Sequence, residues 1–70
     1  MNPSIFERHD VRICIVEDDH VIRYAFKEIL EEVKDFHIIN AYSNCEDFIQ
    51  HLEFDKPNVV LMDIELPGMN

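Results

Sequence analysis

The sequence is poor in positive charge. It holds 6 lysines and arginines against 15 aspartates and glutamates, which gives a formal net charge of −9 at pH 7. Nucleic acids and anionic membranes would be repelled by this surplus, so we expect this segment to bind neither. The same surplus suits a protein that binds cations.

Cysteines and long apolar runs are also scarce. The two cysteines, Cys14 and Cys45, lack the close paired spacing of a zinc site or of a disulfide-rich secreted domain, so we interpret both as reduced core thiols. No apolar run approaches the length of a membrane span, and the N-terminus lacks the charged start and apolar centre of a signal peptide. These absences predict a cytoplasmic protein.

The size of the chain permits one small domain. With 47% hydrophobic and 30% charged residues over 70 positions, its composition is that of an ordinary globular protein. A domain this short buries only about 60% of the surface of its unfolded chain. We therefore expect its independent folding to be marginal.

Apolar runs alternate with amphipathic segments along most of the chain. Residues 1–10 lack such a pattern and are interpreted as a leader. In chain order, the expected elements are a strand over 11–16, a helix over 20–34, a strand over 36–41, a helix over about 43–53 and a strand over 59–62. The order is therefore β-α-β-α-β.

Polar residues mark where the helices begin. Asp18 or Asp19 is expected to cap the first helix. Ser43 and Glu46 have the spacing of a capping box, which predicts that the second helix starts there and ends before Pro57. The residues that this helix is expected to bury are Phe48, Ile49 and Leu52, with Cys45 beside them.

The alternation of elements predicts an α/β fold. Strands joined through helices are parallel, their crossovers are right-handed, and continuously apolar strands indicate a sheet covered on both faces. We therefore expect a flavodoxin-like, doubly wound parallel sheet with strand order 2-1-3. In that order the first and third strands are neighbours, and ligands bind at their carboxyl ends, where the winding reverses.

Acidic residues follow both of these strands. Glu17, Asp18 and Asp19 end the first apolar run, and Asp63 ends the third. Carboxylates brought together in this way repel one another unless they are protonated or share a cation. No lysine or arginine lies within residues 17–21 or 62–70 to supply that charge. Ligands that are all oxygen then predict bound Mg²⁺ rather than Zn²⁺.

Simpler interpretations of these residues are available. Asp18 and Asp19 could serve only as helix caps, and Asp63 only as a turn residue. Two acidic clusters expected at one edge of the sheet favour a binding site over these alternatives. Arg23 is interpreted as a solvated helix residue, with docking of a partner as the alternative, and the 4 histidines are scattered without metal-ligand spacing.

Together, these residues resemble the receiver domains of response regulators in bacterial two-component signalling. The resemblance rests on residues 15–19 (IVEDD) at the end of the first strand, on Arg23 one turn into the helix and on residues 61–69 (LMDIELPGM) after the third strand. It implies that residues 11–70 are the N-terminal part of a receiver domain, from its first strand to the loop after its third.

The resemblance implies a role for each acid. Asp63 would be the phosphoacceptor, modified by a sensor histidine kinase, a phosphotransfer protein or a small phosphodonor. Asp18 would bind Mg²⁺ directly or nearly so, Glu17 mainly through water, and Asp63 and the backbone carbonyl of Glu65 would complete the ligands. The ion would neutralise the phosphoryl oxygens. Such a domain assists its own phosphorylation without being a stand-alone enzyme.

Other parts of the receiver family have no counterpart in these 70 residues. They are a hydroxyl residue after the fourth strand, an aromatic switch residue and a lysine after the fifth strand. We therefore expect these residues alone to be impaired in phosphorylation. We also expect the third strand to offer an apolar edge that favours a homodimer. Alternatively, the sequence is an excerpt of a longer regulator, and this edge has no meaning of its own.

Two other function classes compete with the phosphoacceptor. An aspartate phosphatase dependent on Mg²⁺ would usually carry a second Asp two residues after the first, where this chain has Glu65. A receiver-like interaction or dimerisation domain that is never phosphorylated would not be expected to keep Glu17, Asp18 and Asp63 together. The acids therefore favour the phosphoacceptor. A similarity to receivers that precede helix-turn-helix domains suggests transcription regulation as its output.

Overall fold

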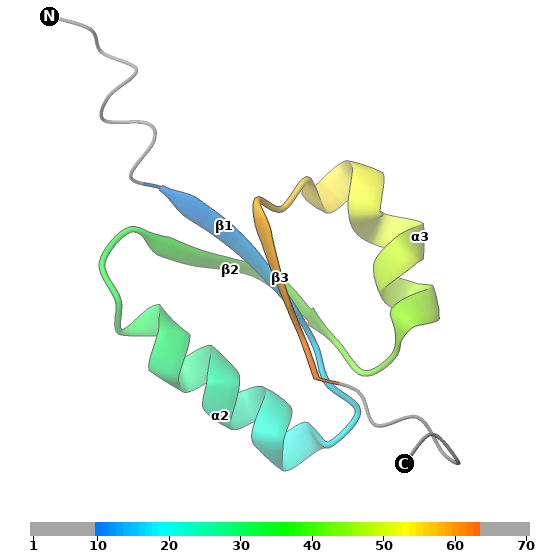
Figure 1. The fold of residues 1–70 in the computed structure, drawn as a ribbon, viewed down its shortest axis with the longest axis horizontal. Helices are drawn as coiled ribbons and strands as arrows, with labels where there is room; N and C mark the ends of the chain where they lie inside the picture. The colour runs from blue at the N-terminus through cyan, green and yellow to red at the C-terminus, as the bar shows by residue number, and fades with distance from the viewer. Residues whose placement is uncertain (1–9, 64–70) are drawn as a thin grey trace, which may run out of the picture.

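Three parallel strands and two helices make up the part of the chain that the structure, a computed structural model, describes, residues 10–63. In chain order they are β1 (Val11–Val16), α2 (His20–Glu31), β2 (Phe36–Tyr42), α3 (Cys45–Asp55) and β3 (Val59–Met62). The strands form one sheet in the order β2-β1-β3 (Figure 1). The predicted β-α-β-α-β order and the flavodoxin-like 2-1-3 sheet are confirmed. Over residues 10–63, no helix is long and apolar enough to cross a membrane.

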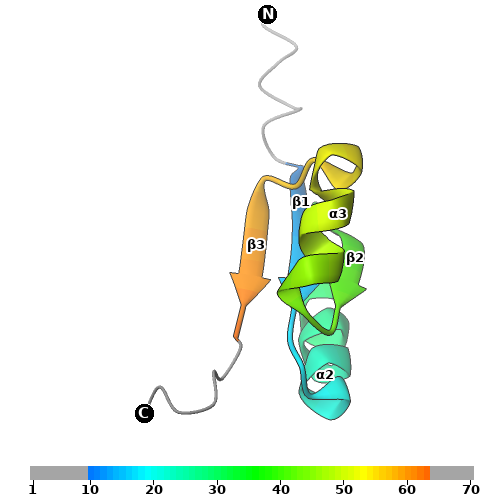
Figure 2. The same ribbon diagram turned by 90° about the vertical axis from the view of Figure 1, so that its right-hand side faces the viewer.

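The central strand forms the core. α2 and α3 lie on opposite sides of the sheet, and both pack on β1 and β2 (Figure 1, Figure 2). Residues Ile13 to Val16 of β1 are at most 3% exposed. Among the described elements β3 pairs only with β1, and three of its four residues, Val59, Val60 and Met62, are exposed.

The helices bury less apolar surface than the sequence predicted. The predicted burial of Ile49 and Leu52 is wrong, because these residues are 63% and 41% exposed. Phe48 is buried, and Cys45 packs against its cluster. Within residues 10–63, α3 packs only on β1 and β2, so only a narrow stripe of the helix is covered by the sheet. Likewise, no residue of α2 is fully buried.

The start of α3 also differs from the prediction. The capping box at Ser43 and Glu46 is wrong, because Asn44 is the N-cap and its Oδ1 accepts a hydrogen bond of 2.8 Å from the backbone N–H of Asp47. Asn44 and Asp47 have the same three-residue spacing one position later. An asparagine caps a helix about as well as a serine, so the spacing alone did not decide between the two.

A β-bulge in β2 decides which of its side chains face α3. The register with β1 shifts after Ile13, so that Cys14 pairs with Asn40 and leaves Ile39 as the extra residue. After this shift, the side chains of Asn40 and Tyr42 both reach Asp55 at the end of α3.

Asp55 is the centre of a buried polar cluster and is only 2% exposed. Its Oδ1 accepts a hydrogen bond of 3.1 Å from the amide of Asn40, and its Oδ2 accepts from the Tyr42 hydroxyl and, at 3.6 Å, from the Cys14 thiol. The Tyr42 hydrogen bond, helped by those from Asn40 and Cys14, holds the pKa of Asp55 below its usual value despite burial. Cys14 and Cys45 are both free thiols, as predicted.

Arg12 fixes the start of β3. Its guanidinium donates to the backbone carbonyls of Asp55 and, at 2.9 Å, Lys56, at the end of α3 where the helix dipole favours a positive charge. The backbone N–H of Arg12 donates a hydrogen bond of 2.9 Å to Asn58 Oδ1, and the backbone carbonyl of Arg12 accepts one of 2.8 Å from the Asn58 N–H. These contacts help to set the register in which β3 runs beside β1.

The cluster around Asp55 makes a prediction for alkaline pH. Burial, with the Asp55 hydrogen bond and charge, raises the pKa of Tyr42 to about 12. Because the folded-state pKa lies above the unfolded value near 10, the stability that this group contributes is fully present below about pH 10 and is lost as the pH rises towards 12. Absorbance titration of tyrosinate in the Tyr24→Phe variant, which keeps Tyr42 as its only tyrosine, should therefore give a midpoint near 12.

The added Asp55→Asn substitution should lower that midpoint without bringing it to the unfolded value, because the carboxylate is removed and the burial remains. A midpoint at the unfolded value in the folded Tyr24→Phe chain would contradict the hydrogen bond between Tyr42 and Asp55.

Candidate functional site

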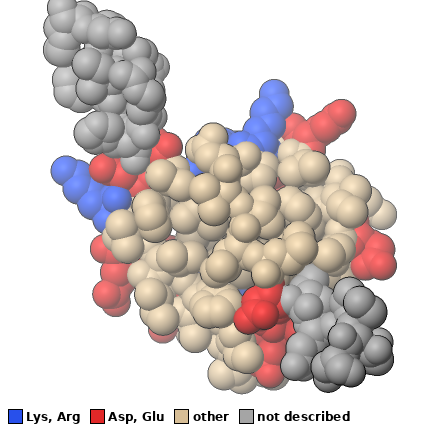
Figure 3. Space-filling model, viewed as in Figure 1, with Lys and Arg blue, Asp and Glu red and all other residues tan. Residues whose placement is uncertain are grey.

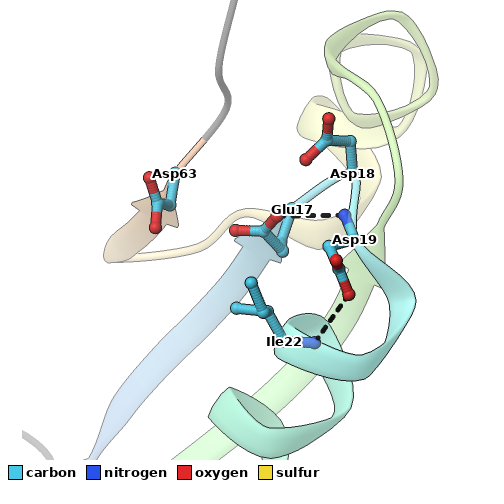
Figure 4. A pocket seen from close by; sticks show the side chains of 5 residues that line it. All are labelled: Glu17, Asp18, Asp19, Ile22 and Asp63. Carbon is cyan, nitrogen blue, oxygen red and sulfur yellow. Dashed lines mark hydrogen bonds between the residues drawn. The ribbon is translucent and has the colours of Figure 1, made fainter.

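The carboxyl ends of β1 and β3 form an acidic pocket. The strand register places Val16 beside Met62, so the residues that follow, Glu17 and Asp63, are neighbours. The Asp63 N–H donates a hydrogen bond of 3.1 Å to the Val16 carbonyl, which fixes the end of β3. The pocket has a volume of about 350 Å³ and is lined by Glu17, Asp18, Asp19, Ile22 and Asp63 (Figure 4).

The structure brings together three of the residues predicted for the site, Glu17, Asp18 and Asp63. The fourth, Glu65 with its backbone carbonyl, lies outside the described residues. Within residues 10–63, no three His, Cys, Asp or Glu side chains are close enough together to hold a metal ion. The described residues therefore line the pocket with acids but do not form a complete coordination shell.

Glu17 is the buried acid of this pocket and is only 3% exposed. Its Oε2 accepts a hydrogen bond of 3.0 Å from the Asp19 N–H, whereas its Oε1 is buried without a hydrogen-bond partner. The Asp19 hydrogen bond lowers the pKa of Glu17, but burial and the nearby carboxyl groups of Asp18 and Asp63 outweigh it, so the pKa is raised. A divalent cation beside Oε1 would relieve both the unpaired oxygen and the repulsion, so the donor chemistry of Glu17 and its acidic neighbours fits such an ion.

Asp19 has a structural task beside the pocket. Its Oδ1 accepts a hydrogen bond of 2.8 Å from the backbone N–H of Val21. It also accepts one of 3.1 Å from the backbone N–H of Ile22 (Figure 4). It is thus the N-cap of α2, which confirms the prediction that Asp18 or Asp19 caps this helix. Because Asp19 takes the cap, the carboxylate of Asp18 is left for the pocket.

Arg23 is tied to the site, so its interpretation as a solvated helix residue is wrong. It is half-buried, and its Nη1 donates a hydrogen bond of 2.7 Å to the backbone carbonyl of Glu17. Side chains on a helix lean towards its N-terminus, so an arginine near the start of α2 reaches back over the end of β1. That directional rule was the signal in the sequence that could have found this contact.

Comparison with known proteins identifies the family. The response regulator receiver domain family matches residues 13–70. One relative, protein-glutamate methylesterase/protein-glutamine glutaminase 2 of Paramagnetospirillum magneticum, is 38% identical over 63 residues, 90% of this chain and 18% of that protein. The CAI-1 autoinducer sensor kinase/phosphatase CqsS of Vibrio cholerae is 37% identical over 62 residues, 89% of this chain and 9% of that protein. Response regulator UvrY of Escherichia coli is 29% identical over 59 residues, 84% of this chain and 27% of that protein.

These relatives share one region with the chain and differ in the rest. The chain spans only 9% to 27% of their lengths, and their names differ. No solved structure matches the chain at a significant level. The family match covers most of the 70 residues and includes both acidic strand ends. The chain therefore belongs to the response regulator receiver domain family.

Proposed function

We propose that this chain is the phosphoacceptor module of a bacterial two-component phosphorelay, phosphorylated on Asp63. The observation that carries the proposal is the pocket in which Asp63 meets Glu17 and Asp18 at the ends of β1 and β3. Membership of the receiver family supports it, because accepting a phosphoryl group is the role that this family implies.

Asp63 is the nucleophile in this proposal. It is exposed at the mouth of the pocket, and its backbone is held by the hydrogen bond to Val16. One carboxylate oxygen attacks the phosphorus of the donor and forms an O–P bond. The bond between phosphorus and the donor breaks, and its electron pair leaves with the donor. The product is an acyl phosphate, and the donor is a sensor histidine kinase, a phosphotransfer protein or a small phosphodonor.

Mg²⁺ is the cation that we propose for the pocket. Asp18 and Asp63 would be direct ligands, Glu17 would act mainly through water, and the Glu65 carbonyl would complete the protein ligands. The unpaired Oε1 of Glu17 and the repulsion of its carboxylate by Asp18 and Asp63 support this assignment. Bound there, the ion would neutralise the phosphoryl oxygens during transfer.

Other assignments stay predictions. They are the division into a leader (1–10) and a partial receiver (11–70), a cytoplasmic location, the absence of stand-alone enzyme activity, and transcription regulation as the output. The match to a protein named as a sensor kinase/phosphatase supports signalling partners of that class.

Phosphorylation tests the acceptor directly. The purified chain is incubated with acetyl phosphate and Mg²⁺ and run on a phosphate-affinity gel. We expect a retarded band that disappears when Mg²⁺ is chelated and is absent from the Asp63→Asn variant, because the amide is not a nucleophile for phosphorus. A retarded band that persists in Asp63→Asn would refute Asp63 as the acceptor.

The extent of modification tests the predicted impairment. UvrY, run on the same gel, is the reference. We expect the 70-residue chain to be modified to a smaller extent, because the lysine and hydroxyl expected from the family resemblance are not supplied in the assay. Uptake equal to that of UvrY would contradict the impairment and leave the acceptor assignment intact.

A receiver-like dimerisation domain is the second candidate, and the β3 edge favours it. Val59, Val60 and Met62 are exposed along this strand. Figure 3 views the molecule from the side on which β3 lies. Uncharged residues cover most of this face, and acidic residues lie towards its margins. Strand edges of this kind pair with other strands, here with a second copy. The net charge of −9 opposes that association.

Salt should therefore control any self-association. Sedimentation equilibrium at high protein concentration is expected to show the dimer population increasing with ionic strength, because salt screens the repulsion between the acidic chains. A Val60→Lys substitution, which places a charge on the edge, should abolish the dimer. A monomer mass at all salt concentrations would refute this candidate.

A further inference from the structure

We propose that Arg23 is a positioning residue for the acidic pocket. Its guanidinium holds the Glu17 peptide so that the unpaired carboxylate oxygen of Glu17 is kept in place for a divalent cation. This inference rests on the proposed binding of Mg²⁺ in the pocket.

Glu17 is held at every polar atom but one. Its N–H donates a hydrogen bond of 2.9 Å to the carbonyl of Tyr42, and its own carbonyl accepts one of 2.7 Å from Arg23 Nη1. In the side chain, Oε2 accepts a hydrogen bond of 3.0 Å from the Asp19 N–H. Only Oε1 is left, and it is buried without a partner. An atom left in this state inside an otherwise satisfied residue points to a ligand that completes it.

Arg23 is the one link from α2 to the Glu17 backbone among these contacts. Asp19 joins the loop to α2 from the other direction, since its carboxylate caps the helix and its N–H binds Glu17. Together with the Arg23 hydrogen bond, these contacts join the end of β1 to the first turn of α2 at both the backbone and the side chain of Glu17. The bond is charge-assisted and half-buried, so it is stronger than an exposed neutral one.

The guanidinium has two opposite effects on a cation in the pocket. Its positive charge repels the ion, so losing the charge alone would tighten Mg²⁺ binding. Its hydrogen bond orients a ligand, and losing such a partner weakens metal binding, by roughly tenfold or more. The sign of the change in affinity therefore separates a positioning role from a purely electrostatic one.

The test compares Arg23→Gln with Lys27→Gln, a matched control that removes the same charge from an exposed position one turn further along α2. Mg²⁺ alone is titrated into each 70-residue chain by calorimetry at fixed ionic strength. We expect Arg23→Gln to weaken binding roughly tenfold. Lys27→Gln should leave the affinity unchanged or slightly tighter, and Arg23→Lys, which keeps a charged donor, should recover part of the loss. Binding by Arg23→Gln as tight as that of Lys27→Gln would overturn the inference.

A second measurement needs no metal. Hydrogen exchange of the Asp19 amide, which donates to Glu17 Oε2, is followed by NMR relative to the amide of Ile15 in the core. We expect faster relative exchange in Arg23→Gln and no change in Lys27→Gln. Unchanged exchange in Arg23→Gln would overturn the positioning role. If the wild-type chain binds no Mg²⁺, the proposed function fails, and this exchange still decides whether Arg23 positions Glu17.

Discussion

Repulsion of the Glu17 carboxylate by the carboxylates of Asp18 and Asp63 is the constraint on which the proposed site depends. The parallel register of β1 and β3 forces the first and last of these together, because each follows a paired strand residue. Glu17 cannot turn away to relieve the repulsion, since its backbone and one carboxylate oxygen are already bonded. The fold thus retains an unfavourable charge arrangement at one end of the sheet, where a cation would be stabilising.

Two acids are buried among the described residues, Asp55 at the end of α3 and Glu17 after β1, and their surroundings differ. Asp55 accepts hydrogen bonds from three side chains, and its pKa is lowered. Glu17 is equally buried but accepts one hydrogen bond, has like charges nearby, and has a raised pKa. Burial alone does not mark a functional acid. In the proposed site, Glu17 is distinguished by a hydrogen-bonding capacity that the protein leaves unmet.

Local patterns in the sequence predicted most of the sheet and the meeting of the acids, because apolar runs and the strand order are enough to place strand ends. They did not predict the start of α3, because Ser43 and Asn44 are neighbouring residues and either one can serve as the N-cap. They also missed that Ile49 stays exposed, because amphipathicity shows which face is apolar and not how much of it a neighbour covers. The contact of Arg23 was missed because it depends on the direction of a side chain across two elements.

Stability measured with and without Mg²⁺ tests the central claim most directly. The free energy of unfolding in urea is compared for the wild-type chain and Asp63→Asn, in chelator and in saturating Mg²⁺. In chelator, the variant should be the more stable, because it removes a repelling charge next to Glu17. In Mg²⁺, the order should reverse, because the ion stabilises only a folded pocket that binds it well. The same order in both conditions would contradict an acidic pocket built to hold a cation.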